Sequence, residues 1–172
     1  MELKIDDHVV YRSVGVCQVI AQEKQRPAGR APILYYKLRP LGDQNSVYYV
    51  PCASADSKLR RLLTREEVLD LIDTMPRPGE EDEAVWTDDR RERKERYSQI
   101  MKGDDYKALV NMISTLYFRK QASEAHGKRF STMDETAMKN AENLMLEEFG
   151  MVLGMEPDAV RSFIAERVGG EV

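Results

Sequence analysis

The residues best suited to binding chemistry lie in one stretch, EDEAVWTDDRRERKERY, residues 81–97. It holds the only tryptophan of the chain, Trp86, and a dense run of basic residues follows it. Arg90, Arg93, Lys94 and Tyr97 recur at helical spacing, which predicts one solvent-exposed basic face on a helix. Arginines can hold DNA phosphates while an aromatic ring lies against or between bases in the minor groove. The stretch therefore predicts a DNA contact.

A structural alternative explains the same residues. Large aromatic side chains are usually buried, so Trp86 would pack between the two halves of the chain. The arginines would then pair with Glu92, Glu95 and the acidic residues that precede the tryptophan. Residue composition by itself favours this alternative. In either case we expect Trp86 to lie just before the N-cap of its helix, packed near Arg90 or Arg91.

The sequence contains no catalytic or metal-binding pattern. The two histidines, His8 and His126, lie far apart in sequence, with no acidic residue at the spacing of metal ligands. There is no phosphate-binding loop and no nucleophile motif. Cys17 and Cys52 lie in apolar segments and are too few for a disulfide framework, so we expect reduced packing residues. We predict no enzymatic activity, no metal and no cofactor.

The charge of the chain is unevenly distributed. The formal net charge of −4 by itself argues against a nucleic-acid partner. However, residues 90–130 carry a net charge of +6, whereas residues 76–89 carry −5 and residues 131–172 carry −6. Because salt screens charges beyond roughly 8–10 Å, a phosphate backbone responds to the local charge. The basic segment is thus compatible with weak, strongly salt-dependent binding to DNA.

Residues 1–63 have the pattern of short β-strands. Four segments are rich in Val, Ile and Tyr and are separated by turn residues: HVVYR, GVCQVIAQ, ILYYKL and SVYYV. A fifth short strand is expected at residues 58–63. A flat sheet of this size would leave both of its edges exposed, so the pattern predicts a small antiparallel β-barrel.

The pattern becomes helical from Thr64 onward. Residues 64–67, TREE, form a capping box that starts a helix reaching about Met75, and PRPGEEDE then forms an acidic linker. We therefore expect an α+β protein with a barrel at 1–63, a helix and linker at 64–82, and an all-helical domain at 83–172. Within that domain, we expect helices to start at Thr87, at Asp104, at either Ser131 or Thr132, and at Pro157. We expect helices to end at Gly103 and at Gly150.

Several motifs, in order along nearly the whole chain, are similar to those of the CarD/CdnL family of bacterial transcription regulators. KIDDHVVYRSVGVCQVIA resembles the family's opening K-x-G-D-x-V-V-Y-P, and YYVP resembles the end of its fourth strand. The lone tryptophan before a basic helix, the KGDD break, and LYFRK…GKRFSTMDE…AENLMLEEF follow the family's helical half. Asp6-Asp7 replaces the usual Gly-Asp, Arg12 replaces a proline, and Tyr49 stands where some members carry an arginine.

This resemblance implies a Tudor-like barrel that binds the β subunit of RNA polymerase by strand pairing, with Val47, Tyr48 and Tyr49 as candidate contacts. It also implies a helical domain that touches promoter DNA upstream of the −10 element. Trp86 would wedge into the minor groove at the upstream edge of the transcription bubble and hinder its closing. The family's backbone contacts are best matched by Arg90, Arg91, Arg93 and Lys94.

The expected cell biology follows from the same observations. No apolar run is long enough to span a bilayer, and the N-terminus does not resemble a signal peptide, so we expect a cytoplasmic protein without a membrane partner. A monomer is expected, and a dimer swapped through the barrel edges is compatible with the sequence. The alternative function is a protein-interaction module that binds RNA polymerase or another partner without touching DNA.

Overall fold

The structure, a computed structural model, describes residues 1–80 and 84–168. It divides into two compact units, Met1–Leu63 and Thr64–Val172, which are described separately. Three acidic residues of the predicted linker, at positions 81–83, lie outside the described residues.

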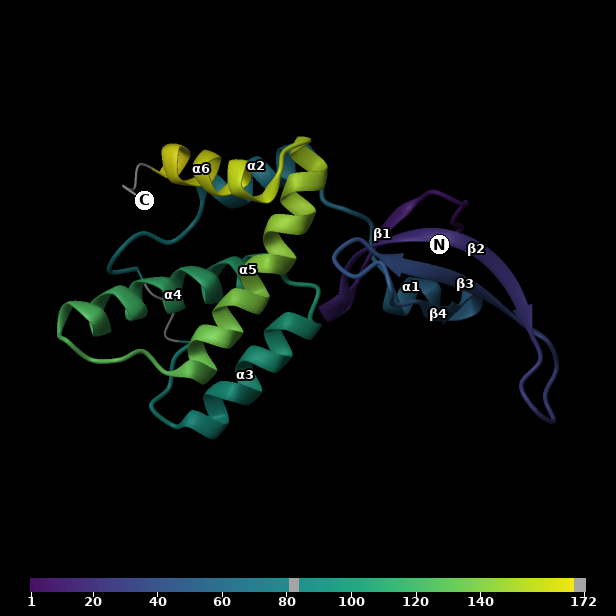
Figure 1. Ribbon diagram of the computed structural model, residues 1–172, viewed down its shortest axis with the longest axis horizontal. Helices are drawn as coiled ribbons and strands as arrows, with labels where there is room; N and C mark the ends of the chain where they lie inside the picture. The colour runs from purple at the N-terminus through teal and green to yellow at the C-terminus, as the bar shows by residue number, and fades with distance from the viewer. Residues whose placement is uncertain (81–83, 169–172) are drawn as a thin grey trace. The chain divides into compact units, whose positions relative to one another are not determined.

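The first unit is an antiparallel sheet in the order β1-β2-β3-β4 (Figure 1). Its strands are β1 (His8–Tyr11), β2 (Gly15–Gln25), β3 (Ile33–Pro40) and β4 (Tyr48–Pro51). The sheet is curled into a half-barrel. Neighbouring strands in the sheet are also neighbours in sequence, so each pair is joined by a local connection. The predicted antiparallel, Tudor-like β domain is confirmed.

The predicted fifth strand is wrong for most of its length. Residues after β4 form a 3-10 turn, η2 (Cys52–Ser54), and a short helix, α1 (Ala55–Lys58). The chain then returns to the free side of β1, where Val10 and Arg60 exchange two backbone hydrogen bonds of 2.9 and 3.0 Å. This isolated bridge covers one point of the β1 edge, and β4 is left as the other edge of the sheet.

The core of the β unit explains the strand pattern. Apolar side chains from all four strands meet on the inner face of the curled sheet, together with residues from the segment after β4. The buried set is Val9, Cys17, Val19, Tyr36, Leu38, Val50, Ala55 and Leu59. Both cysteines are free, and Cys17 is fully buried within this set, in accord with the predicted packing role.

The second unit is helical, as predicted. Its helices are α2 (Arg65–Asp73), α3 (Arg90–Lys102), α4 (Tyr106–Ala125), α5 (Thr132–Leu153) and α6 (Pro157–Val168). The long helix α5 lies at the centre and contacts each of the other four (Figure 1). Side chains from α3, α4 and α5 and from the segment before α3 form one apolar cluster, which includes Val85, Tyr97, Leu109, Met112, Leu116, Ala137, Met138 and Ala141.

Local capping signals located most helix starts to within two residues. The capping box at Thr64 is confirmed, because Thr64 and Glu67 exchange hydrogen bonds of 3.2 and 2.7 Å. The predicted N-caps at Thr87 and Asp104 are wrong, since α3 begins after Asp89 and α4 after Asp105. An ionised carboxylate is a strong acceptor for the free amides of a first helical turn, which favours these two positions.

Gly150 does not end α5, contrary to prediction. The helix continues to Leu153 and ends at Gly154, whose φ of 69° lies in the left-handed region. A Cβ atom at position 150 would lie 2.7 Å from the carbonyl oxygen of Met155. Gly150 therefore permits a close approach between α5 and the turn that leads into α6.

Candidate functional site

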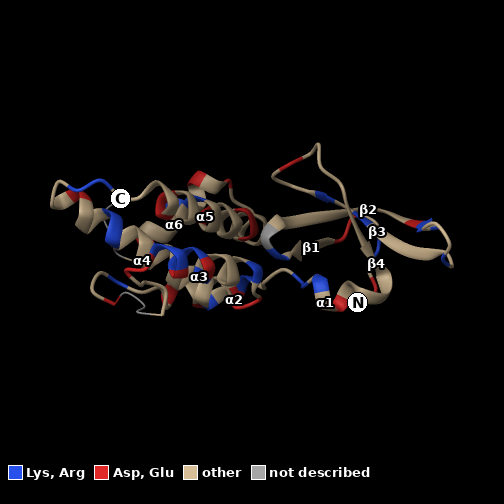
Figure 2. Ribbon diagram, turned by 90° about the horizontal axis from the view of Figure 1, so that it is seen from below, with Lys and Arg blue, Asp and Glu red and all other residues tan. Residues whose placement is uncertain are grey.

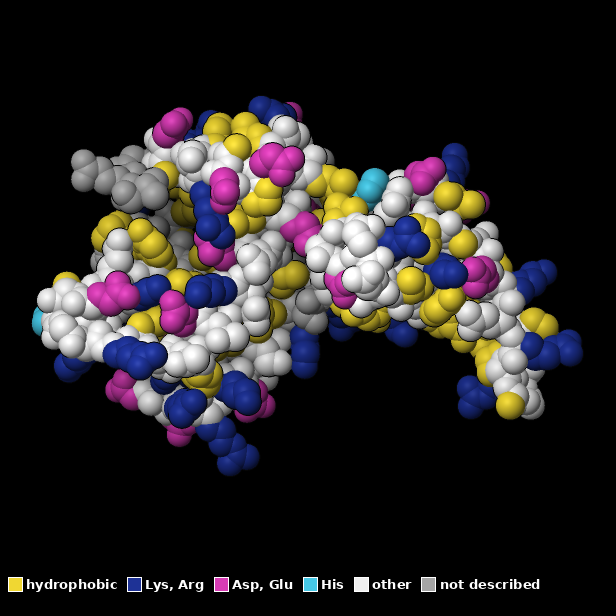
Figure 3. Space-filling view, in the orientation of Figure 1, with side chains coloured by type: hydrophobic (Ala, Val, Ile, Leu, Met, Phe, Trp, Pro, Cys, Tyr) yellow, Lys and Arg dark blue, Asp and Glu magenta, His cyan; other side chains and the backbone are white. Residues whose placement is uncertain are grey.

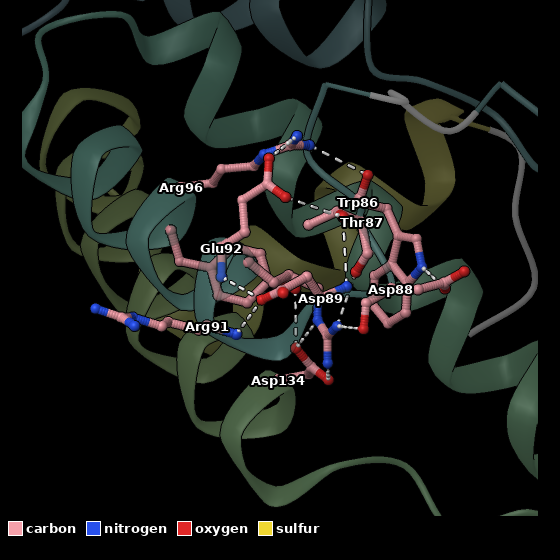
Figure 4. A network of polar contacts seen from close by, with 10 residues as sticks. Trp86, Thr87, Asp88, Asp89, Arg91, Glu92, Arg96 and Asp134 are labelled. Atoms are coloured by element: carbon pink, nitrogen blue, oxygen red, sulfur yellow. Dashed lines mark hydrogen bonds and ion pairs between the residues drawn. The ribbon is translucent and has the colours of Figure 1, made fainter.

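The segment that carries Trp86 is fixed to helix α3 by two arginines of the basic run. Arg96 Nη1 donates to the carbonyl oxygens of Ala84 and Trp86 at 3.0 and 3.2 Å. Arg93 Nη1 donates to the carbonyl oxygen of Thr87 at 2.8 Å. Val85 is buried in the helical core. Figure 4 shows this short segment passing across the start of α3, held by side chains from that helix.

Arg93 is the centre of a buried polar network. Its Nε and Nη2 atoms donate to the two carboxylate oxygens of Asp134 on α5, at 2.8 and 2.9 Å (Figure 4). The hydroxyl of Tyr97 donates to the same carboxylate at 2.9 Å. Arg93 is 6% exposed and Asp134 is 1% exposed. The network therefore satisfies a buried charge pair with several well-formed hydrogen bonds.

The pKa values of this network shift as its geometry requires. The hydrogen bond to Asp134 raises the pKa of Arg93, so the guanidinium stays charged. Burial, followed by the hydrogen bond to Asp134, raises the pKa of Tyr97 well above its ordinary value. The predicted exposed face is therefore wrong at Arg93 and Tyr97. Both side chains face inward. The prediction that they lie on the same helix as Lys94 is confirmed.

The ring of Trp86 lies beneath two guanidinium groups. The Cζ atoms of Arg93 and Arg119 lie 4.3 and 4.1 Å from the ring centroid. Its indole N–H faces Asp88, with 3.4 Å between Nε1 and Oδ1 (Figure 4). The cations over the ring are therefore Arg93 and Arg119, whereas the sequence predicted Arg90 or Arg91.

Trp86 is neither sealed in the core nor fully exposed. The ring packs against the apolar cluster of the helical unit and is only partly buried. It also lines a cleft of about 560 Å³ together with Arg119, Lys128 and Arg129. A route from the ring to solvent therefore exists within the helical unit.

Three cations of the basic run face outward. Arg90, Arg91 and Lys94 are exposed, and none of them pairs with a carboxylate among residues 1–80 and 84–168. Lys and Arg positions recur along α3 in Figure 2, and Figure 3 shows basic side chains over this helix with acidic ones among them. Among the residues that the structure describes, the pairing expected from the structural alternative is seen for Arg96, which pairs with Glu92 at 2.6 Å.

The outer edge of strand β4 is the exposed feature of the β unit. Val47, Tyr48 and Tyr49 are 38%, 37% and 41% exposed. Tyr48 packs edge-on against Tyr11, with 5.6 Å between ring centroids. The ammonium group of Lys37 lies 5.7 Å from the centroid of Tyr49. Since β4 pairs with β3 on one side only, its other side can accept an additional strand.

Other kinds of site have no support in the described part of the chain. No group of three or more His, Cys, Asp and Glu side chains there is placed to hold a metal ion. Over the same residues, none of the helices combines the length and apolar character needed to cross a bilayer.

Sequence reasoning overlooked the second wall of the Trp86 cleft. Arg119, Lys128 and Arg129 belong to the basic segment, but no motif assigns them to a site. The adjacent basic pair in GKRF was the available signal. Its proximity to Trp86 depends on how α4 and α5 pack, which a local pattern does not encode.

Comparison with known protein families identifies the β unit. Residues 3–63 match the CarD-like/TRCF RID domain, an RNA-polymerase-interacting domain. The match ends where the β unit ends and does not extend into the helical unit. No curated protein matches the chain in sequence. The N-terminal unit thus carries the signature of an RNA-polymerase-interacting domain, which supports a transcription-related role in binding RNA polymerase.

Proposed function

We propose that this protein is a transcription regulator of the CarD/CdnL kind, which binds RNA polymerase and stabilises the open promoter complex. The observation that carries this proposal is the match of residues 3–63 to an RNA-polymerase-interacting domain. The resemblance of the helical half to the same family supports the second part of the proposal. The partner is the polymerase β subunit, and the promoter contact lies upstream of the −10 element.

The β4 edge is the proposed polymerase contact. Val47, Tyr48 and Tyr49 offer an exposed strand with aromatic side chains, and strand addition supplies backbone hydrogen bonds that need no deep pocket. Tyr49→Glu in the full chain is expected to lower affinity for the β subunit. Trp86→Ala is the matched control and should bind polymerase as the wild type does.

Trp86 is the proposed wedge in the minor groove, and Arg90, Arg91 and Lys94 are the proposed phosphate contacts. The fixed segment at 84–88 supports the wedge, because a ring on a rigid backbone loses little conformational freedom when it binds. Arg93 was also a candidate phosphate contact. Its bidentate pairing with Asp134 instead supports a role in positioning the ring.

The energies involved are compatible with a wedge. A guanidinium over an indole contributes about 0.5–2 kcal/mol, whereas a base stacked on an aromatic ring contributes about 1–3 kcal/mol. Exchanging one contact for the other is therefore feasible at a melted step, where unstacking costs least. A net gain of about 2 kcal/mol shifts the equilibrium towards the open bubble roughly thirtyfold.

The second candidate is a protein-interaction module without DNA contact, which the Arg96–Glu92 ion pair on α3 favours. Binding to a forked promoter DNA at increasing salt separates the two. The proposal predicts binding that weakens steeply with salt and exceeds binding to closed duplex of the same sequence. The interaction module predicts no binding at any salt concentration, and that result would refute DNA contact.

A further inference from the structure

The cleft beside Trp86 has the features of an anion site that the proposed wedge does not use. It lies among the C-terminal part of α4, the loop at residues 126–131 and the start of α5. Its volume of about 560 Å³ falls within the range of small-ligand sites, roughly 300–1,000 Å³.

The cleft carries positive charge that the residues described by the structure do not neutralise. Among its described lining residues the only carboxylate is Asp134, which is engaged by Arg93 and Tyr97. Neither Lys128 nor Arg129 pairs with a carboxylate anywhere in residues 1–80 and 84–168, and both are exposed. The described lining therefore holds a concentration of cations without matching anions.

Arg119 is the least satisfied of these cations. It makes no ion pair with the described residues, and its Nε is buried without a hydrogen-bond partner. Buried polar groups are normally hydrogen-bonded, so an orphaned guanidinium nitrogen needs an explanation. Its guanidinium instead lies over Trp86, 4.1 Å from the ring centroid. An oxygen acceptor that entered the cleft would satisfy this nitrogen.

The start of α5 adds to the preference for an anion. Ser131 is the N-cap of this 22-residue helix and lines the cleft, but its side chain makes no capping hydrogen bond. The positive end of the helix dipole therefore faces the cleft without a side-chain acceptor at the N-cap. Asp134 and Glu135 in the first turn of α5 offset part of this dipole, so the free N-cap adds less to the preference for an anion than the cations do.

We propose that the cleft binds a phosphate of a single-stranded nucleic-acid segment whose base stacks on Trp86. The proposal rests on the DNA contact proposed above and names a second set of contacts for it. The phosphate accepts hydrogen bonds from Arg119 and from the Lys128–Arg129 pair. Drawing the Arg119 guanidinium towards the phosphate uncovers the indole, so binding of the phosphate and stacking of the base support one another.

The single tryptophan makes the proposal measurable in the full chain. Trp86 fluorescence is titrated with a short oligothymidylate, with thymidine 5′-monophosphate and with inorganic phosphate, at several salt concentrations. The wild type is expected to show a saturable change with the oligonucleotide. In Lys128→Gln/Arg129→Gln the slope of log affinity against log salt should fall by about 0.7 for each phosphate that the variant no longer neutralises.

Two further variants keep the test specific. Arg119→Lys keeps the charge but removes the Nε donor and the planar group, so it should also weaken binding. Lys102→Gln/Lys107→Gln removes two cations of the helical unit that do not line the cleft, and it should bind as the wild type does. Equal thermal midpoints for all variants would show that the fold is intact.

Three outcomes decide the matter. Wild-type affinity in both Arg119→Lys and Lys128→Gln/Arg129→Gln overturns the proposal, while salt-dependent binding to forked DNA leaves the proposed function standing. Binding of the free nucleotide or of inorganic phosphate as tight as that of the oligonucleotide overturns it in favour of a small-ligand site. Absence of binding by the wild type to both the oligonucleotide and forked DNA overturns the DNA contact itself.

Discussion

The two sides of helix α3 use the same kind of residue for different purposes. On the inner side, Arg93 is 6% exposed and is committed to Asp134 and to the backbone that carries Trp86. On the outer side, Arg90, Arg91 and Lys94 are exposed and have no carboxylate partner in the described chain. Position relative to the core, rather than residue type, therefore decides which cations remain available to a ligand.

The inner side also explains how a very polar helix is held in place. Only Tyr97 is a fully buried apolar residue of α3, with Ile100 and Met101 partly buried beside it. The bidentate contact between Arg93 and Asp134 fixes the helix against α5 in one orientation. A fully satisfied buried network of this kind specifies geometry, because each partner left alone would be strongly unfavourable.

The largest expected effect comes from breaking this network. Asp134→Ala leaves the Arg93 guanidinium buried without a counter-charge, so the free energy of unfolding should fall by about 3–5 kcal/mol. Denaturation in urea measures the change. Replacing both partners, as in Arg93→Met/Asp134→Leu, should be clearly less damaging than Asp134→Ala. If the double variant were the less stable of the two, the network would not be the anchor of α3.

A smaller loss is expected from Tyr97→Phe, which removes one hydrogen bond to a charged carboxylate while keeping the ring. The free energy of unfolding should fall by about 1.5–3 kcal/mol. Asp134 keeps its two contacts with Arg93, so the helical content should remain unchanged in circular dichroism. A variant as stable as the wild type would show that the hydroxyl contributes nothing to the network.

Tyr97→Phe also changes the response to alkaline pH. The unfolded chain releases this phenolic proton near the ordinary pKa of about 10, whereas burial raises the pKa of Tyr97 in the folded protein. The stabilisation is therefore fully present below pH of about 10 and is lost as the pH rises towards the folded-state pKa. Between these limits the wild type should lose stability more steeply than the variant, as measured by urea midpoints.

The N-cap of α3 is expected to contribute to stability. Asp89 accepts hydrogen bonds from the amides of Arg91 and Glu92 at 2.8 and 2.9 Å. Asp89→Ala should therefore lower the free energy of unfolding by about 1 kcal/mol. Thr87→Ala is the matched control, because Thr87 is not the N-cap. If urea denaturation showed that Thr87→Ala lowers the free energy of unfolding more than Asp89→Ala does, Thr87 would be the N-cap, as predicted from sequence.

Replacing the exposed cations on the outer side of α3 should barely change the stability of the protein. Arg90→Gln/Arg91→Gln/Lys94→Gln is expected to change the free energy of unfolding by no more than about 0.5 kcal/mol. On forked promoter DNA, the same variant should lower the salt slope by roughly 0.9 for each phosphate that these cations neutralise in the wild type. An unchanged slope would remove these cations from the DNA contact and leave the cleft residues as the candidates.

Local chemistry made much of the fold predictable. The capping box at Thr64 and the strand alternation in residues 1–63 depend on neighbours in sequence, and both are seen in the structure. The role of Gly150 was not predictable in this way, because its reason is the approach of Met155 across a turn. The strand predicted at residues 58–63 is reduced to an isolated bridge between Arg60 and Val10, which also depends on a distant part of the chain.

The candidate site was predictable only in part. Trp86 and the exposed cations stood out by residue type and spacing. The burial of Arg93 was hidden, because its partner Asp134 lies on a different helix, 41 residues further along the chain. Arg119 was hidden for the same reason, since its contact with Trp86 exists only once α4 has packed beside the start of α3.

The lifetime of the promoter open complex shows whether Trp86 holds the transcription bubble open. Polymerase saturated with wild-type protein or with Trp86→Ala is formed on a promoter, and dissociation is followed after addition of a competitor. The proposed wedge predicts that the variant binds polymerase normally but shortens the lifetime, by up to roughly thirtyfold if the ring contributes about 2 kcal/mol. Equal lifetimes for the two proteins would contradict a role for Trp86 in holding the bubble open.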